Sequence, residues 1–286
     1  MKTFNEKTAV ITGAGSGLGR SFALQLYAAG ARLALCDVDM PGLEETQSLT
    51  GDDGGRVSIH QVDVSNRAQM EAFAGDVLAL HGAVDILINN AGISMTPMLF
   101  DELTDAQFEK VIDINMWGVY HGIRAFLPHL RTRPEASIVN VSSFAGLVGL
   151  YNYSAYSMSK AAVRGLSEVL QCELAGSNVS VLLVHPGGVK TNLMKNAPNV
   201  QEDKREAIHS NFTKFAFLDV DKAVKQILRV VQRGKKIRLV LGVDAHLMWT
   251  IRRLFPQSYP KVIKAIFSQA TFEESKVAPF RKDRPT

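Results

Sequence analysis

The stretch Thr8–Gly19, TAVITGAGSGLG, decides the fold of this chain. Its first five residues are apolar or β-branched, as in a short buried strand, and a helical pattern runs from about residue 18 to residue 29. The glycines between them let the turn close and let the backbone approach a ligand. A strand that enters a helix through such a turn presents a positive helix N-terminus, where a pyrophosphate can rest. The spacing, Gly-x-x-x-Gly-x-Gly, is a variant of the commoner G-x-G-x-x-G motif.

The same alternation of strand and helix continues along the chain. Short apolar segments that end in polar or small residues are separated by helical patterns, so we expect parallel strands with helices on both faces. The sequence therefore predicts an α/β fold with a doubly wound, Rossmann-like sheet, formed by a single domain over residues 1–242 and followed by a helical extension over residues 243–286. Strands are expected at residues 8–12, 32–37, 57–61, 84–88, 137–141, 180–184 and 237–241.

Composition limits the classes of protein to consider. The chain has 286 residues, of which 46% are hydrophobic and 21% charged, as in an ordinary globular protein. We find no signal peptide and no apolar run of about 18 residues, the length of a membrane span. The only two cysteines, Cys36 and Cys172, are too few for a disulfide framework, and both are expected to be buried. These features predict a cytoplasmic protein.

The net charge of +4 is unevenly distributed. Residues 234–286 carry eleven Lys/Arg against four Asp/Glu, a balance of +7, whereas the rest of the chain has 21 against 24. The main domain therefore lacks the positive surface that nucleic-acid binding requires, and no nucleic-acid partner is expected.

Acidic and amide residues follow several of the expected strands. Asp37 ends the second strand, where a carboxylate can accept hydrogen bonds from both ribose hydroxyls of an adenosine and would repel a 2′-phosphate. Neither Ser16 nor Val38 is basic, so the sequence favours NAD over NADP as cofactor. Asp63, after the third strand, is placed for the adenine edge. The short turn Asn89–Gly92 suits a backbone that lies against the cofactor.

The segment from Ser142 to Lys160 carries the candidate chemistry. Tyr156 and Lys160 lie four residues apart and share one helix face, and a neighbouring cation favours the phenolate. A tyrosine pKa lowered from about 10 to about 7 would need roughly 4 kcal/mol of differential stabilisation. Such a tyrosine could exchange a proton with a carbonyl or alcohol oxygen, and the hydroxyl of Ser143 could bind the same oxygen. A Tyr-x-x-x-Lys pair is also common on exposed helices, so the pair alone decides nothing.

Regular structure breaks at Pro186-Gly187-Gly188, after the sixth strand. His185 precedes this break and has no second histidine at ligand spacing, so it is expected to be structural. Residues 192–218 are polar and loop-like, which suggests a lid over a substrate. Candidate pocket residues are largely apolar and favour a hydrophobic substrate: Met95, Phe144, Leu147, Leu150, Tyr153, Phe212 and Phe215.

Other chemistries find no support in the sequence. No H-E-x-x-H or C-x-x-C motif is present, so no metal is predicted. No G-x-S-x-G motif surrounds Ser143, which argues against serine hydrolysis.

Together, in their order and spacing, these motifs resemble the short-chain dehydrogenase/reductase family over roughly residues 7–242. The resemblance implies an NAD-dependent oxidoreductase that acts on CH-OH groups and uses Tyr156 as general acid/base. Ser143, and not the adjacent Ser142, would polarise the substrate oxygen. Lys160 would lower the tyrosine pKa and bind the nicotinamide ribose, and Asn115 would hold a water in a proton relay. The resemblance also implies a homodimer or homotetramer in which the helices of Asn115 and Tyr156 pair between subunits.

Residues expected to contact the cofactor, from the motifs and the resemblance together, are Gly13, Ser16, Gly17, Leu18, Gly19, Asp37, Asp63, Val64, Asn90, Ala91, Gly92, Tyr156, Lys160, Pro186, Gly187, Val189 and Thr191. Residues expected to contact the substrate are Ser143, Phe144, Leu150 and Tyr156. A protein on the same fold that senses NAD or binds a partner without catalysis is the alternative, although such a protein need not keep Asn115, Ser143, Tyr156 and Lys160 together.

The extension contains two apolar stripes at helical spacing. The first is Leu247, Met248, Ile251, Leu254 and Phe255, and the second is Val262, Ile263, Ile266 and Phe267. Basic residues, Arg252, Arg253, Lys261 and Lys264, line their polar sides. Two interpretations remain open: the extension packs on the domain or on a neighbouring subunit, or it lies on an anionic membrane as a peripheral contact.

Overall fold

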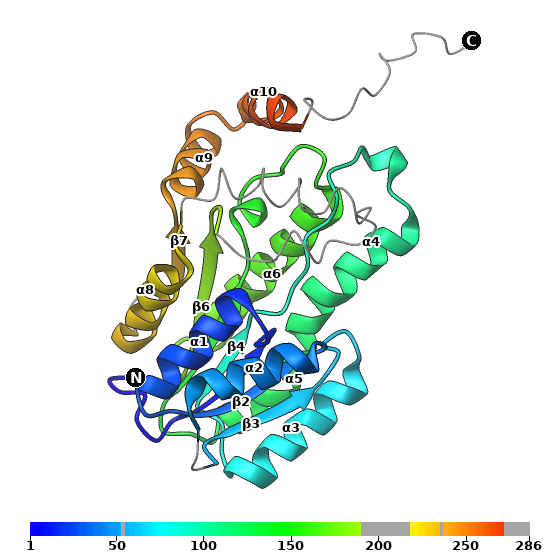
Figure 1. Cartoon of the computed structure of the whole chain (residues 1–286). Helices are drawn as coiled ribbons and strands as arrows, with labels where there is room; N and C mark the ends of the chain where they lie inside the picture. The colour runs from blue at the N-terminus through cyan, green and yellow to red at the C-terminus, as the bar shows by residue number, and fades with distance from the viewer. Residues whose placement is uncertain (53–54, 190–217, 235–236, 272–286) are drawn as a thin grey trace, which may run out of the picture.

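The computed structural model describes residues 1–52, 55–189, 218–234 and 237–271, and its side chains as far as Ile266 (Figure 1). Seven parallel strands form one sheet in the order β3-β2-β1-β4-β5-β6-β7. The predicted doubly wound fold is confirmed. The strands are β1 Thr8–Thr12, β2 Arg32–Asp37, β3 Val57–Gln61, β4 Ile86–Asn89, β5 Ala136–Val141, β6 Val179–Pro186 and β7 Arg238–Leu241.

Helices cover both faces of this sheet (Figure 1). They are α1 Gly17–Ala28, α2 Met40–Thr50, α3 Arg67–His81, α4 Asp105–Ile112, α5 Gly118–Leu130, α6 Ser154–Glu173, α8 Val220–Arg233, α9 Val243–Leu254 and α10 Tyr259–Thr271. Because successive strand residues point to opposite faces, the central strands are apolar on both sides. In β1, Ala9 and Ile11 join a core with α1, α2 and α8, whereas Val10 joins a core with α3, α5 and α6.

The helical region between β4 and β5 is interrupted. Its first helix is capped by Thr104, whose hydroxyl forms a capping box with the side chain of Gln107. A π-helical turn, Asp113–Trp117, then separates α4 from α5. Such turns are frequent at functional sites, and this one contains Asn115.

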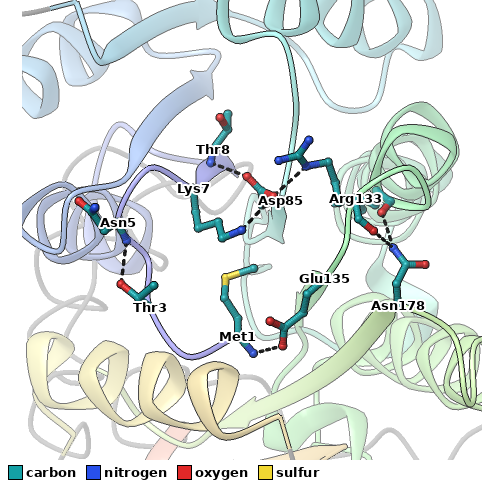
Figure 2. A network of polar contacts seen from close by, with 10 residues as sticks. Met1, Thr3, Asn5, Lys7, Thr8, Asp85, Arg133, Glu135 and Asn178 are labelled. Atoms are coloured by element: carbon teal, nitrogen blue, oxygen red, sulfur yellow. Dashed lines mark hydrogen bonds and ion pairs between the residues drawn. The ribbon is translucent and has the colours of Figure 1, made fainter.

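A polar network ties the amino-terminal segment to the amino end of the sheet (Figure 2). Asp85, which is buried, accepts hydrogen bonds from the backbone of Thr8 at 3.0 Å and from Nε of Arg133 at 2.9 Å. Nζ of Lys7 lies 3.6 Å from the same carboxylate. The terminal ammonium of Met1 pairs with Glu135. Asp85, just before β4, thus links the start of β1 to the segment that precedes β5.

Of the two cysteines, Cys36 is buried in β2 as expected. The expectation for Cys172 is wrong: it is exposed, because it lies on the outward face of α6 near the end of that helix.

The helices of the extension pack against the domain on one face. Ala245 and Met248 of α9 and Ile263 of α10 form a small core with Val240 of β7 and Val148. The extension is therefore anchored close to the segment that follows β5. In the described residues, no helix is long and apolar enough to cross a membrane.

Candidate active site

A cavity of about 280 Å³ opens at the carboxyl edge of the sheet. It extends from β1 and β4, where the strand order reverses, which is the place where ligands bind in open α/β sheets. Most of the residues expected at a site line it: Gly13, Ser16, Gly17, Leu18, Asp37, Asp63, Val64, Asn90, Ala91, Gly92, Ser143, Phe144, Leu150, Tyr153, Tyr156, Lys160, Pro186, Gly187 and Val189. Segments far apart in the sequence therefore meet in one cavity.

Several expected residues lie elsewhere. Gly19 lies behind the cavity wall, where a Cβ would stand 1.9 Å from the carbonyl oxygen of Gly13, so only glycine allows helix and turn to pack this closely. Met95 and Leu147 are buried in neighbouring cores and do not line the cavity. Thr191, Phe212, Phe215 and all but the last residue of the expected lid lie outside the described residues.

The glycine turn is held against the end of β4. Asn90 donates through Nδ2 to the carbonyl oxygens of Thr12 and Gly13, at 3.0 and 3.1 Å, and Oγ1 of Thr12 accepts from the backbone of Asn90 and Ala91, both at 3.0 Å. Gly13 has φ +67°, and a Cβ there would stand 2.8 Å from Cα of Ala91. The side chain of Ser16 does not cap the first turn of α1, so it accepts no hydrogen bond from the backbone amides there. Gly17 and Leu18 of this turn line the cavity.

The carboxylate of Asp37 is fixed beside this turn. It accepts hydrogen bonds from the backbone of Gly15 at 2.9 Å and of Asp39 at 3.1 Å. Arg20, a nearby cation that no motif indicated, is paired with Glu45 at 2.6 Å and also donates to the carbonyl oxygen of Gly15. This end of the cavity therefore presents an anchored carboxylate.

At the other end lie Ser143, Tyr156 and Lys160. The hydroxyl of Ser143 lies close enough to that of Tyr156 to interact with it, and Oγ of Ser143 accepts from the backbone of Ala145 at 3.1 Å. Oγ of Ser142 instead donates to the carbonyl oxygen of Lys160 at 2.8 Å and so fastens the strand end to α6. Of the two adjacent serines, Ser143 is the one that meets the tyrosine.

The electrostatics of this group differ from the expectation. Burial raises the pKa of Tyr156 above its ordinary value, and the interaction with Ser143 opposes that rise only in part. Burial also lowers the pKa of Lys160 to about 8. Its ammonium donates to the carbonyl oxygen of Val141 at 3.1 Å and lies 5.9 Å from the ring centroid of Tyr156. Desolvation of the phenol outweighs a cation at this separation, so Tyr156 keeps its proton at neutral pH.

Asn115 is fully buried behind the cavity. Its side chain pairs with the backbone of Ile93, accepting at 2.8 Å and donating at 2.9 Å, and Nδ2 also reaches Oγ of Ser159 at 3.1 Å. A Cβ on Gly92 would stand 3.0 Å from Oδ1 of Asn115 and 3.2 Å from Nζ of Lys160. The π-helical turn thus directs an amide at the loop after β4, next to the lysine.

Two further residues support the site and were not predicted to do so. His185 is buried, and its Nδ1 lies 2.8 Å from the carbonyl oxygen of Ser143. Burial lowers the pKa of His185 to about 4, so the ring is neutral, and Nδ1 must donate because the carbonyl can only accept. The expectation of a structural histidine agrees with this contact, but its link to Ser143 appears only when β5 and β6 are paired.

The second is Asp244, in the first turn of α9. Its Oδ2 accepts a hydrogen bond from the backbone of Gly188 at 2.8 Å, and a Cβ on Gly187 would stand 2.2 Å from its Oδ1. The glycines after Pro186 therefore make room for a carboxylate of the extension. The only sequence signal was the pair of glycines itself.

Comparison with known proteins agrees with this geometry. The family model described as short chain dehydrogenase matches residues 7–202. The chain belongs to the short-chain dehydrogenase/reductase family. Among its relatives is SadH of Mycobacterium tuberculosis, whose assignment as an oxidoreductase is provisional; it is 38% identical over 268 residues, which are 93% of this chain and 96% of that one. Levodione reductase of Leifsonia aquatica is 34% identical over 196 residues, 68% of this chain and 73% of that protein.

Solved structures of the family share the architecture. A short-chain dehydrogenase/reductase from Burkholderia phymatum, crystallised in complex with NAD, superposes with a TM-score of 0.80 at 31% identity, over 92% of this chain and 97% of that one. An alcohol dehydrogenase from Thermococcus sibiricus, complexed with 5-hydroxy-NADP, superposes with a TM-score of 0.70 at 26% identity, over 84% and 96%. The chain is thus an oxidoreductase of this family. Among the described residues, no cluster of three or more His, Cys, Asp or Glu could hold a metal ion.

Proposed function

We propose that this protein transfers a hydride between NAD(H) and a secondary alcohol or ketone with a hydrophobic body. One observation supports this best: a single cavity joins the anchored carboxylate of Asp37 to the pair formed by Ser143 and Tyr156. A dinucleotide has a ribose at each end and a pyrophosphate between them, and the glycine turn lies between the two ends of this cavity.

The residues present fit NAD. The amides of the first α1 turn and the glycine at position 13 would hold the pyrophosphate, and Asp37 would bind the adenosine ribose. A 2′-phosphate would meet this carboxylate, and Arg20, the cation close by among the described residues, is already paired with Glu45. Lys160 would bind the nicotinamide ribose. NAD is therefore proposed over NADP.

The cofactor, when bound, donates or accepts the hydride, and the chain handles the proton. In the reducing direction the phenol of Tyr156 donates its proton to the substrate oxygen, and the hydroxyl of Ser143 stabilises the charge that develops on that oxygen. The raised pKa of Tyr156 suits this donor role at neutral pH, since the proton is present when it is needed. In the oxidising direction the phenol oxygen of Tyr156 must accept the proton from the alcohol. Higher pH favours this step, because it favours the phenolate.

Asn115 supports this chemistry from behind, since its amide holds Ile93 and the loop that carries Gly92 next to Lys160. A water held by Asn115 would link Lys160 to solvent, as the family resemblance implies. The substrate side of the cavity is formed by Phe144, Leu150 and Tyr153, which favours a hydrophobic alcohol or ketone.

A homo-oligomer built on α5 and α6 is also proposed. Large apolar side chains are exposed on the outer faces of this helix pair and of the adjacent π-helical turn: Trp117, Tyr120, Met158 and Val169. Pairing of these helices between two subunits would bury them.

The test is a spectrophotometric screen of purified protein against a panel of secondary alcohols and hydrophobic ketones, each with NAD(H) and with NADP(H). We expect turnover with NAD(H), and a relative gain with NADP(H) when Asp37→Ser removes the carboxylate. Tight binding of NAD without turnover on any substrate would favour the sensor alternative. Equal use of both cofactors by wild type and variant would contradict the assignment of Asp37.

A further inference from the structure

The outer face of helices α9 and α10 differs from that of an ordinary surface helix. Val243, Leu247 and Leu254 are 86%, 54% and 67% exposed. At about 100° per residue these positions fall within roughly 40° of one another, so they form one stripe along α9. Phe255, which follows the helix, is 57% exposed. A helix that packs on a domain on one side is normally polar on the other.

The inner face of this extension is already occupied. Ala245 and Met248 pack with Val240 and with Ile263 of α10, so the body of the protein covers the opposite side of α9. In α10, Val262 and Ile266 are exposed on one side of the buried Ile263. The exposed apolar side chains are therefore additional to those that the fold uses. In the parts of the chain that the structure describes, no side chain buries them, so a partner from outside the domain would be needed to cover them.

The charges on α9 and α10 indicate what kind of partner would cover these exposed apolar side chains. Arg252, Arg253, Lys261 and Lys264 lie on the same two helices, whose only acidic residue, Asp244, is bound to Gly188. Among the residues that the structure describes, none of the four cations forms an ion pair. In a two-fold dimer the same patch would face itself, and these cations would repel one another.

An anionic lipid surface has the opposite charge and an apolar interior close beneath it. Each Lys or Arg near such a surface contributes about 1 kcal/mol, or about fivefold in partition. Exposed Leu and Phe side chains can enter the boundary between headgroups and acyl chains. We propose that α9 and α10 form a peripheral docking surface for membranes that contain anionic lipids. The two helices lie beyond the carboxyl ends of β6 and β7, the edge at which the cavity opens (Figure 1).

The test uses the full chain and co-sedimentation with vesicles of phosphatidylcholine, with or without phosphatidylglycerol. Wild-type protein is expected to pellet with the anionic vesicles at low salt, and less at high salt because exposed charges are screened. Arg253→Gln with Lys261→Gln should weaken this binding about 25-fold, from fivefold per charge. Leu247→Gln with Leu254→Gln should abolish it. Thermal unfolding and any dehydrogenase turnover without vesicles should stay as in wild type, because these side chains are outside the cavity.

Two matched controls lie on other surfaces. Lys222→Gln with Lys225→Gln removes two exposed charges from α8, and Leu80→Gln removes a 64% exposed leucine from α3; neither should change vesicle binding. Equal binding to both kinds of vesicle, or no binding, would overturn the proposal. A dimer in lipid-free buffer that the leucine variant dissociates, without vesicle binding, would assign the surface to a second copy. Vesicle binding is read without turnover, so this proposal can fail or hold independently of the proposed function.

Discussion

The two ends of the sheet differ in how a buried charge is compensated. At the amino end, the buried carboxylate of Asp85 meets two cations, Lys7 and Arg133, and a backbone amide (Figure 2). At the carboxyl end, the buried ammonium of Lys160 has no carboxylate partner among the described residues and donates to the carbonyl oxygen of Val141. The same strands form both ends of the sheet. The different surroundings of the two buried charges therefore come from the side chains at each end.

A charge that the protein fully compensates stabilises the native state and has little left to offer a ligand. A buried charge without a counterion is unfavourable, as the lowered pKa of Lys160 shows. Such a group gains most when a ligand supplies the missing partner. We therefore expect the charges at the amino end of the sheet to stabilise the fold and those at the carboxyl end to bind a ligand. Each expectation can be tested separately.

The largest effect is expected from Tyr156→Phe. Removing the phenol oxygen removes the proposed acid, so turnover should fall by about 10³-fold, within the range of general acid–base catalysis. The binding of NAD, followed by fluorescence titration, should change little. Denaturant unfolding should show no loss of stability, since the ring remains and one buried polar atom is gone.

Ser143→Ala provides the matched comparison, because it removes the other hydroxyl of the same pair. It should also reduce turnover but should leave the proton donor in place. If Tyr156→Phe retained most of the turnover, the assignment of the carboxyl end would be wrong.

At the amino end, Asp85→Asn should act on stability alone. It leaves Arg133 and Lys7 without their counterion, and the free energy of unfolding should fall by about 2–3 kcal/mol. Turnover per folded molecule should match wild type. Glu71→Gln breaks the exposed pair with Arg67 and should leave the unfolding midpoint unchanged. Loss of turnover by folded Asp85→Asn would erase the proposed division between the two ends.

The architecture of the sheet could be predicted from the sequence because it depends on local patterns. The apolar strands and the glycine turn at Gly13 each depend on residues close in the chain. The cavity residues followed for the same reason, since parallel strands bring their carboxyl ends to one edge. Strand ends moved by a few residues, which local patterns do not fix.

What could not be predicted depends on partners far apart in the sequence. His185 reaches Ser143 across a strand pair, and Asp244 reaches Gly188 across more than fifty residues, so no local spacing marks either contact. The raised pKa of Tyr156 depends on how deeply the ring is buried, whereas the sequence shows only that a lysine is near. No local sequence pattern predicted the π-helical turn that contains Asn115.

The pH dependence of Lys160 should separate its two roles. Above about pH 8 the buried lysine loses its proton, whereas an unfolded lysine keeps it to about pH 10.4. Ketone reduction should therefore decline by about fivefold as pH rises from 8 to 9, because the cation near the cofactor site is lost. Over the same interval the unfolded state binds more protons, so this group makes the free energy of unfolding rise with pH. Lys160→Met should show neither change, and parallel profiles for variant and wild type would contradict the assignment.

The smallest effect is expected where the extension touches the carboxyl end. Asp244→Ala frees the backbone of Gly188 and should raise KM for NAD about fivefold, with a smaller change in kcat, because the loop after β6 lines the cavity but carries no proton. Asp244→Asn keeps an acceptor oxygen without the charge and should restore a KM close to wild type. If Asn and Ala behaved alike, the negative charge and not the hydrogen bond would matter. Since Asp244 is the first polar contact between the extension and the cavity, a rescued Asn variant would show that α9 positions the site through geometry alone.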